Sequence, residues 1–202
     1  MRQELSIWFA IAAFVALWLI AIVITGRSLS VPWEAIKLLP DVISIYVLLY
    51  LAFNKWMWRW RMFGGWLVTV PDLQGTWKGQ LKTTWTESNI VASLPIEIYV
   101  TIRQTLHEIH VSSFTKESVS HSDASALCID LDKGQRILTY TYGNIPQSGV
   151  RDRSEIHFGA ARLRIVLSPN KRLEGEYWTD RKSTGHLILE FDNRNLLEQF
   201  PN

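Results

Sequence analysis

The fold of this chain is decided first by an uncharged run of 22 residues, LSIWFAIAAFVALWLIAIVITG, which extends from Leu5 to Gly26. A helix needs about 20 apolar residues to cross a hydrocarbon core about 30 Å thick. The run is therefore predicted to be a membrane-spanning helix. A cleaved signal peptide is the alternative, but its apolar region would cover only about 7–15 residues and end in small residues. Thr25 to Ser28 is a poor cleavage site, which favours a retained span.

A second apolar segment follows at residues 31–53, and its first half carries charges. The charged residues are Glu34, Lys37 and Asp41. Their spacing places all three on one helical face, where Glu34 and Lys37 can pair. Either the helix begins near Leu38 and this pair lies among lipid headgroups, or the three form a polar face that meets protein or water at membrane depth. Pro40, which lacks an N–H, can start or kink this span.

Tryptophan alternates with Lys and Arg between Asn54 and Arg61. Tryptophan gathers at the headgroup level and Lys/Arg on the cytoplasmic side, so this segment is predicted to be an interfacial anchor. It completes a membrane domain of residues 1–63. Its three cations, with Arg2, outweigh Arg27 between the helices, which places both termini in the cytoplasm. A basic, aromatic run can also bind nucleic acid, but its position beside a spanning helix favours the membrane.

The charge balance changes along the chain. Six basic and 3 acidic residues precede Pro71, whereas 15 basic and 16 acidic residues follow it. The second part is therefore not expected to bind DNA or RNA through a basic surface. The single cysteine, Cys128, cannot form an internal disulfide, which excludes a disulfide-stapled module. Because Cys128 lies in an alternating segment, it is predicted to be a buried packing residue.

From Asp72 onward, β-branched and aromatic residues alternate with polar residues in short runs separated by turn residues, which predicts strands. The eight expected strands are Gly75–Thr86, Pro95–Thr105, His107–Lys116, Ser122–Asp132, Gln135–Tyr142, Ser154–Leu167, Arg172–Asp180 and Gly185–Asp192. After a linker at residues 64–71, residues 72–202 are predicted to form a cytoplasmic, ligand-binding, antiparallel up-and-down β-barrel. The fold class is an α+β membrane protein.

The second strand shows why a barrel is favoured. Ile96, Ile98, Val100 and Ile102 share one face, and Glu97, Tyr99, Thr101 and Arg103 share the other. One face is therefore buried and the other is in water. Closure suits consecutive antiparallel strands of this kind and is expected to leave no exposed edges. About eight strands enclose room for side chains or one small ligand, so ligand binding is the natural function.

Motifs for catalysis are absent from the sequence. It contains no glycine-rich phosphate loop, Walker-type lysine or Gly-x-Ser-x-Gly elbow. His107 and His110 are three residues apart on an expected strand and would point to opposite faces, unlike the histidines of a helical zinc motif. We therefore expect no catalytic residue, no metal site, no cofactor and no enzymatic activity.

Two kinds of side chain could hold an anionic ligand that carries bases. The chosen residues are Arg103, Arg162 and Arg164 for phosphate, and Tyr140 and Tyr142 for stacking. Guanidinium groups bind phosphate through paired hydrogen bonds, and bases stack on aromatic rings. Tyr177 and Trp178 offer further flat faces. The alternative is that these residues bind no ligand: the arginines would lie on the solvent-exposed face of a strand, and the aromatic residues would pack in the core of the barrel.

Gly75-Thr76-Trp77, at the start of the first strand, resembles the Gly-x-Trp opening of lipocalin-type barrels. Together with two N-terminal spans and the cationic tryptophan anchor, it makes nearly the whole chain resemble a family of bacterial effectors. These are the two-transmembrane, β-strand-rich effectors of CBASS, the cyclic-oligonucleotide-based antiphage signalling systems. The resemblance rests on the order of elements more than on an invariant motif.

The resemblance implies an inner-membrane effector whose barrel binds a cyclic dinucleotide made by a partner nucleotidyltransferase. Binding would drive oligomerisation and membrane disruption, so membrane lipids and further copies of the chain are also partners, with Glu34, Lys37 and Asp41 as the effector face. Two alternatives remain: a membrane-tethered carrier of a lipid or other apolar ligand, and an anchor that recruits a protein through the barrel exterior. Arginines and aromatic residues inside the barrel would favour a nucleotide, and an aliphatic interior would favour a lipid.

Overall fold

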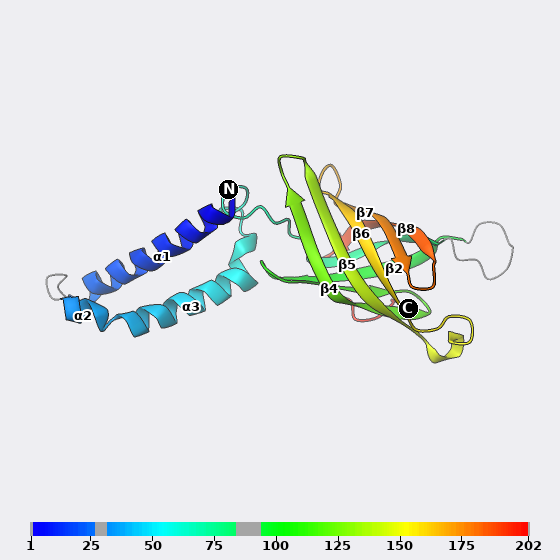
Figure 1. The fold of residues 1–202 in the computed structure, drawn as a ribbon, viewed down its shortest axis with the longest axis horizontal. Helices are drawn as coiled ribbons and strands as arrows, with labels where there is room; N and C mark the ends of the chain where they lie inside the picture. The colour runs from blue at the N-terminus through cyan, green and yellow to red at the C-terminus, as the bar shows by residue number, and fades with distance from the viewer. Residues whose placement is uncertain (1, 27–31, 84–93, 202) are drawn as a thin grey trace. The chain divides into compact units, whose positions relative to one another are not determined.

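The computed structural model describes residues 2–26, 32–83 and 94–201. The chain divides into two compact units, residues 1–69 and residues 70–202. The first unit contains the α-helices, and the second contains the strands and a short 3-10 helix, η2 (Ser148–Val150) (Figure 1).

The first unit is built around two long helices. Its elements are α1 (Arg2–Thr25), α2 (Pro32–Ile36), α3 (Leu39–Lys55) and the short 3-10 helix η1 (Met57–Arg59). Two stretches, Ile7–Thr25 and Trp33–Lys55, are long and apolar enough to cross a membrane. Only 6% and 11% of these stretches are buried inside the structure, so they are not the core helices of a soluble fold. The two candidate membrane spans predicted from the sequence are therefore present.

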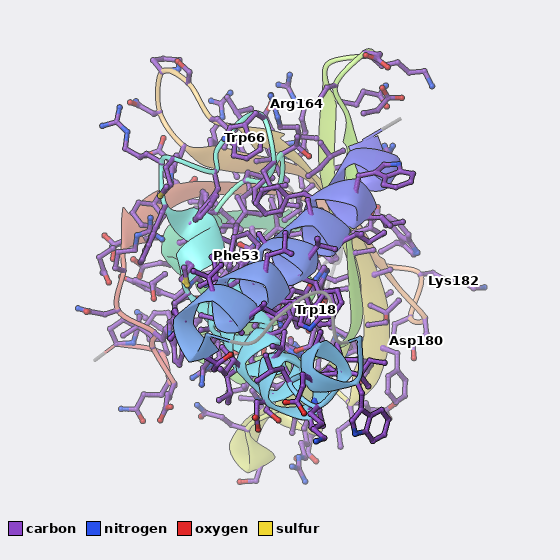
Figure 2. The ribbon with its side chains drawn as sticks, turned by 90° about the vertical axis from the view of Figure 1, so that its left-hand side faces the viewer. Trp18, Phe53, Trp66, Arg164, Asp180 and Lys182 are labelled. Carbon is purple, nitrogen blue, oxygen red and sulfur yellow. The ribbon has the colours of Figure 1, made fainter. Side chains whose placement is uncertain are left out.

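The two long helices pack together through an apolar cluster and two hydrogen bonds. The buried members of the cluster are Ile22, Ala35, Leu38 and Val42. The indole Nε1 of Trp18 donates to the backbone oxygen of Ala35 at 3.1 Å, so Trp18 lies on the side of α1 that faces α2 (Figure 2). The hydroxyl of Tyr46 on α3 donates to the backbone oxygen of Ala10 at 3.2 Å. Each hydrogen bond gives a side-chain donor an acceptor within the protein, because the hydrocarbon of a membrane offers none.

Pro40 starts the second long helix. Helix α3 begins at Leu39, with Pro40 in its first turn, where the missing N–H breaks no helical hydrogen bond. A turn at Lys37 and Leu38 separates α2 from α3, which confirms that the long helix begins near Leu38. Glu34 and Lys37 do pair, at 3.1 Å. Glu34 and Asp41 therefore lie on separate helices, and a shared polar face for the three charges stays a prediction.

The second unit is a closed antiparallel barrel, as the sequence predicted. Its strands are β1 (Gly75–Thr83), β2 (Ile96–Gln104), β3 (Ile109–Phe114), β4 (Ser118–Asp130), β5 (Gln135–Pro146), β6 (His157–Val166), β7 (Arg172–Thr179) and β8 (Thr184–Asn193). Each strand pairs with the next one along the chain, and β1 pairs with β8 to close the barrel. The predicted last residues of the first strand, 84–86, lie outside the described residues.

The largest differences from the predicted boundaries occur in β4 and β5. Strand β4 begins four residues earlier than predicted, at Ser118, and β5 continues four residues further, to Pro146. The two strands pair over this whole extension, from Ser118 opposite Pro146 to His121 opposite Gly143. The Gly, Asn and Pro of the extension resemble a turn in the sequence, but Pro is tolerated at the end of a strand. His107 lies outside β3, in the preceding connection.

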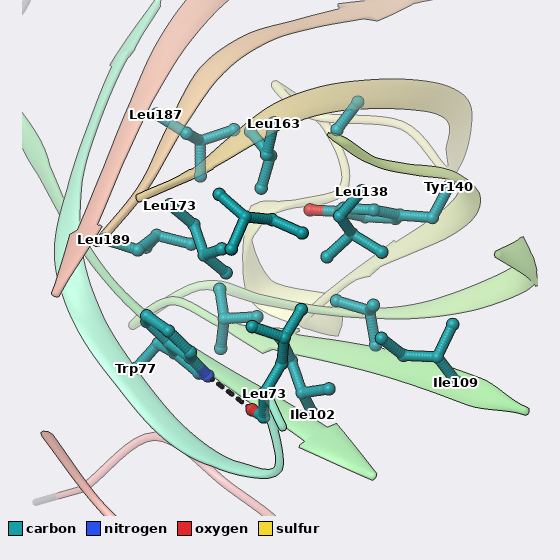
Figure 3. Packing of buried hydrophobic residues seen from close by; sticks show 14 of the residues in the cluster. Leu73, Trp77, Ile102, Ile109, Leu138, Tyr140, Leu163, Leu173, Leu187 and Leu189 are labelled. Atoms are coloured by element: carbon teal, nitrogen blue, oxygen red, sulfur yellow. Dashed lines mark hydrogen bonds between the residues drawn. The ribbon is translucent and has the colours of Figure 1, made fainter. Parts of the chain in front are cut away.

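One end of the barrel is closed by apolar side chains (Figure 3). Leu73 and Trp77 are fully buried there, and the Trp77 indole Nε1 donates to the Leu73 backbone oxygen at 2.9 Å. Gln104 holds this segment, because its Oε1 accepts from the Leu73 N–H at 2.8 Å. Gly75 has a φ of +133°, and a Cβ there would lie 2.5 Å from the Asn193 backbone oxygen. The Gly-x-Trp motif thus combines a residue that must be glycine with the indole that fills the closed end.

Two sequence-based predictions about β4 are wrong. Cys128 is exposed, because Leu127 and Ile129 occupy the inward positions of β4. Closure of the barrel also leaves an exposed edge. Strand β3 pairs with β4 only at Ser112 to Phe114, because β3 has six residues against thirteen in β4. Along residues 124–130, β4 therefore has no strand partner on its β3 side within the described part of the chain.

Candidate ligand-binding cavity

The barrel contains a cavity of about 530 Å³ at the end opposite Leu73. Its walls come from the ends of the strands and from the connections at residues 115–117, 147–156 and 180–183. The volume lies within the range of about 300–1,000 Å³ that is usual for small-ligand sites. The polar and aromatic lining residues include Ser118, Ser120, Tyr140, Tyr142, Asn144, Arg153, Ser154, His157, Tyr177, Thr179, Arg181 and Ser183.

Three tyrosines form the aromatic part of the wall. Tyr140 and Tyr142 are successive inward residues of β5, and their ring centroids are 5.9 Å apart. Tyr177 enters the cavity from β7. Burial raises the pKa of all three phenols, so each hydroxyl keeps its proton at neutral pH and can donate a hydrogen bond. The structure thus places Tyr140 and Tyr142, both chosen from the sequence, in one cavity.

Glycines on neighbouring strands make room for two of these rings. Gly159 of β6 lies opposite Tyr142, and Gly185 of β8 lies opposite Tyr177. A Cβ on Gly159 would lie 2.5 Å from Cζ of Tyr142, and a Cβ on Gly185 would lie 2.4 Å from a ring carbon of Tyr177. Each ring therefore covers the inner side of a glycine and presents its other face to the cavity.

Asn144 is held at a fixed orientation beside the tyrosines. Its Nδ2 donates to Oγ of Ser120 at 2.8 Å and to Oγ of Ser118 at 3.1 Å. Its Oδ1 is buried and has no hydrogen-bond partner among the described residues. Buried acceptors are usually satisfied, so a small movement of this wall would offer a ligand an acceptor.

Cationic groups reach the cavity from the connections rather than from the strands. Arg181 contacts two neutral groups, because its Nη1 lies 3.4 Å from Oγ of Ser154 and its Nη2 lies 3.4 Å from Nε2 of His157. Arg153 forms an ion pair with Glu117, with Nη2 and Oε1 2.5 Å apart. Both arginines therefore place a guanidinium group at the wall of the cavity.

His157 is neutral in this arrangement. Its Nδ1 lies 2.9 Å from the Glu155 backbone oxygen, which can only accept, so Nδ1 carries the proton and Nε2 accepts from Arg181. Burial lowers the pKa of the imidazole, and the nearby Arg181 charge lowers it further. The cavity therefore presents a guanidinium, a neutral imidazole and neutral phenols, a set that can bind an anion with planar groups.

The three arginines chosen from the sequence lie elsewhere. Arg103, Arg162 and Arg164 are all exposed on the outer face of the barrel. Arg103 pairs with Glu198 at 3.3 Å, and Arg164 pairs with Glu174. None of the three lines the cavity, and a role for them in binding stays a prediction. Trp178 is likewise on the outer face, with 46% of its surface exposed.

The sequence analysis did not single out Asn144, Arg153, His157 or Arg181 for ligand binding. Asn144 and His157 lie in segments that were interpreted as turn or strand start, and the two arginines lie in connections. The signal that could have found the wall is the inward series Leu138, Tyr140, Tyr142. A strand whose inward residues change from apolar to amphipathic leaves the packed core and enters a cavity.

Comparison with known proteins gives two matches. The profile of the family described as "Cap15, cyclic dinucleotide receptor domain" matches residues 68–190, which is more than half of the chain. Over 183 residues the chain is 25% identical to CD-NTase-associated protein 15 of Staphylococcus schleiferi, and the alignment covers 91% of each protein. That alignment is longer than the barrel unit, so it includes part of the helical unit.

Proposed function

This chain belongs to the Cap15 family, whose barrel is a cyclic dinucleotide receptor domain, and we propose that it is a membrane effector in which ligand binding in the cavity drives disruption of the bilayer. The ligand is a cyclic dinucleotide supplied by a partner nucleotidyltransferase. The protein acts without cleaving the ligand. Its place is the bacterial inner membrane, with both termini in the cytoplasm.

The observation that carries this proposal is the chemistry of the cavity lining. A cyclic dinucleotide has two phosphodiesters and two flat bases. The faces of Tyr142 and Tyr177 suit stacking, and Arg181 suits a phosphodiester. A carrier of an apolar ligand would instead require an aliphatic interior, and this cavity has arginines, serines and an asparagine on its wall. The lining therefore favours the nucleotide over the lipid.

The helical unit supports the membrane half of the proposal. Lys55 ends α3, and Arg59 and Arg61 follow it; the Lys55 Nζ and Arg59 Cζ each lie 4.8 Å from the centre of a tryptophan ring. This combination of aromatic and cationic groups is typical of the cytoplasmic interface. Asp41 lies exposed in the first turn of α3 and makes no ion pair with any residue in the described ranges. A carboxylate at membrane depth seeks water or a partner, so Asp41, with Glu34 and Lys37, is proposed to act when copies assemble.

Dye-filled vesicles that contain the full chain test the whole proposal. We expect leakage on addition of one member of a panel of cyclic dinucleotides, and recovery of that ligand intact by chromatography. Arg181→Gln should weaken ligand binding by roughly ten- to hundredfold and raise the ligand concentration needed for leakage by a similar factor. Leakage without any ligand, or clear binding of fatty acids in place of nucleotides, would contradict the receptor function.

Asp41→Leu separates binding from the membrane effect. Insertion of Asp at the centre of a span costs about 2.5–3.5 kcal/mol, so this substitution should not impair insertion. We expect normal ligand binding but no leakage. Leu49→Ala, a change on the exposed surface of the same helix, is the control and should do much less. Full leakage from the Asp41→Leu variant would show that Asp41 only marks the start of the helix.

A further inference from the structure

Strand β4 carries an edge that the closed barrel does not use. The hairpin of β4 and β5 continues past the neighbouring strands (Figure 1). On its β5 side, β4 is paired as far as Asp130, whereas on its β3 side the pairing stops at His121. Residues 124–130 therefore present backbone N–H and C=O groups with no strand partner among the described residues.

Side chains do not protect this edge. Proteins usually guard exposed edges with Lys, Pro or a strong bulge. The outward residues along the middle of this edge are Ala124, Ala126 and Cys128, which are small, uncharged and exposed, and the charged Asp130, paired with Lys133, stands only at its last position. One irregularity, between Ser122 and Ala124, lies at the start of the edge and leaves the remaining residues regularly paired with β5. The edge is therefore open to an added strand.

We propose that this free edge of β4 pairs with the same edge of a second copy of the chain, as an antiparallel β4–β4 ladder across a two-fold axis. An antiparallel strand edge is complementary to itself, so one surface serves both copies. The inference is independent of the ligand proposal, because it requires only the edge.

Charges at the two ends of the edge fix the register. Asp123 lies at one end, exposed and without an ion pair to any residue of the described ranges, and Lys133, which pairs with Asp130 of its own chain at 3.2 Å, lies in the turn beyond the other end. A ladder centred on Cys128 brings Asp123 of each copy close to Lys133 of the other, so opposite charges meet at both ends. In that register the two Cys128 side chains lie directly across from each other, with their Cβ atoms about 4.5–5.5 Å apart.

The natural cysteine provides the first test, because it is the only cysteine in the chain. The full chain in detergent micelles is treated with a mild oxidant and examined by non-reducing electrophoresis. We expect a disulfide-linked dimer through Cys128. A variant with Cys128→Ala and Thr141→Cys, which moves the thiol to an exposed position on β5, should give little dimer. Equal cross-linking from both positions would indicate random collision and overturn the proposal.

Cys128→Lys is the disrupting variant, because this side chain is exposed and, in the proposed register, lies directly across from the same residue of the second copy. Two like charges across the axis should lower dimer formation by about tenfold or more. Thr141→Lys adds the same charge on the neighbouring strand and should change nothing. Amide hydrogen exchange then tests the pairing itself: residues 124–130 should be protected in the unmodified chain and exchange faster with Cys128→Lys. Equal exchange in both proteins would overturn the proposal, even if the helical unit holds copies together.

Discussion

The two ends of the barrel are made by the same strands but from different side chains. Along β5 the inward residues are Leu138, then Tyr140 and Tyr142, then Asn144, so the wall changes from apolar to polar within one strand. At the Leu73 end, apolar residues fill the interior completely. At the other end, tyrosine, serine and arginine surround a cavity. Stability and ligand binding are therefore expected to respond to different substitutions.

The largest effect is expected at the closed end, from Trp77→Ala. Trp77 is fully buried and its indole satisfies the Leu73 backbone oxygen. Loss of a buried aromatic side chain lowers the free energy of unfolding by about 3–5 kcal/mol. Urea denaturation of the full chain in detergent measures this loss in the free energy of unfolding. Trp178→Ala, on the outer face, is the matched control and should change stability by only about 0.5 kcal/mol. Similar losses from both variants would mean that the closed end is not the source of stability.

Arg181→Gln is expected to give the second largest effect, at the open end. Removal of one charged hydrogen bond weakens binding by about 1.5–3 kcal/mol, or roughly ten- to hundredfold. Calorimetry with the cyclic dinucleotide that the unmodified chain binds gives the ratio of the dissociation constants of the variant and the unmodified chain. Arg164→Gln removes an arginine from the outer face and should leave the affinity nearly unchanged. If Arg164→Gln weakened binding and Arg181→Gln did not, the ligand would lie outside the barrel, near the arginines that were predicted from the sequence.

A smaller effect is expected from Gly159→Ala, which tests the placement of the Tyr142 ring. The added Cβ would collide with the ring and lie 2.8 Å from the Trp178 backbone oxygen, so the ring must turn away from the wall. Stacking of a base on one ring contributes about 1–3 kcal/mol, and part of this should be lost. Gly143→Ala is the control, because its Cβ would be 3.6 Å from the Phe158 ring, an ordinary contact. Ligand affinity that is equal in both variants would contradict a stacking role for Tyr142.

The sequence predicted the features that depend on local repetition. An uncharged run of 22 residues and a two-residue alternation are visible in short windows, so the spans and the barrel followed from them. Tyr140 and Tyr142 were selected only as aromatic rings that could stack on bases, and the structure places both on the cavity wall. The two-residue alternation should have placed Arg162 and Arg164 outside, since Leu163 and Ile165 alternate with them and are buried.

Other features depend on how distant segments meet. Arg153 and Arg181 come from connections, and no periodicity relates them to the strands that they approach in the fold. Gly159 makes room for the Tyr142 ring because the two residues lie opposite each other on paired strands, and this pairing is a property of the fold. The free edge of β4 follows from the difference in length between β3 and β4, which the predicted boundaries concealed.

The smallest expected effect is a dependence of stability on pH that belongs to the open end. Burial lowers the pKa of His157, so the unfolded chain binds a proton at this residue more readily than the folded chain does. Its contribution to stability is complete above the unfolded pKa of about 6.5 and is lost as the pH falls from there through the folded pKa. We therefore expect the unfolding temperature to drop between about pH 7.5 and about pH 5.5, and to drop less with His157→Gln. A phosphate beside the imidazole would favour its protonated form, so the bound ligand should reduce the loss. If both proteins lose the same stability over this interval, the pH response arises elsewhere and the open end is no more sensitive than the closed one.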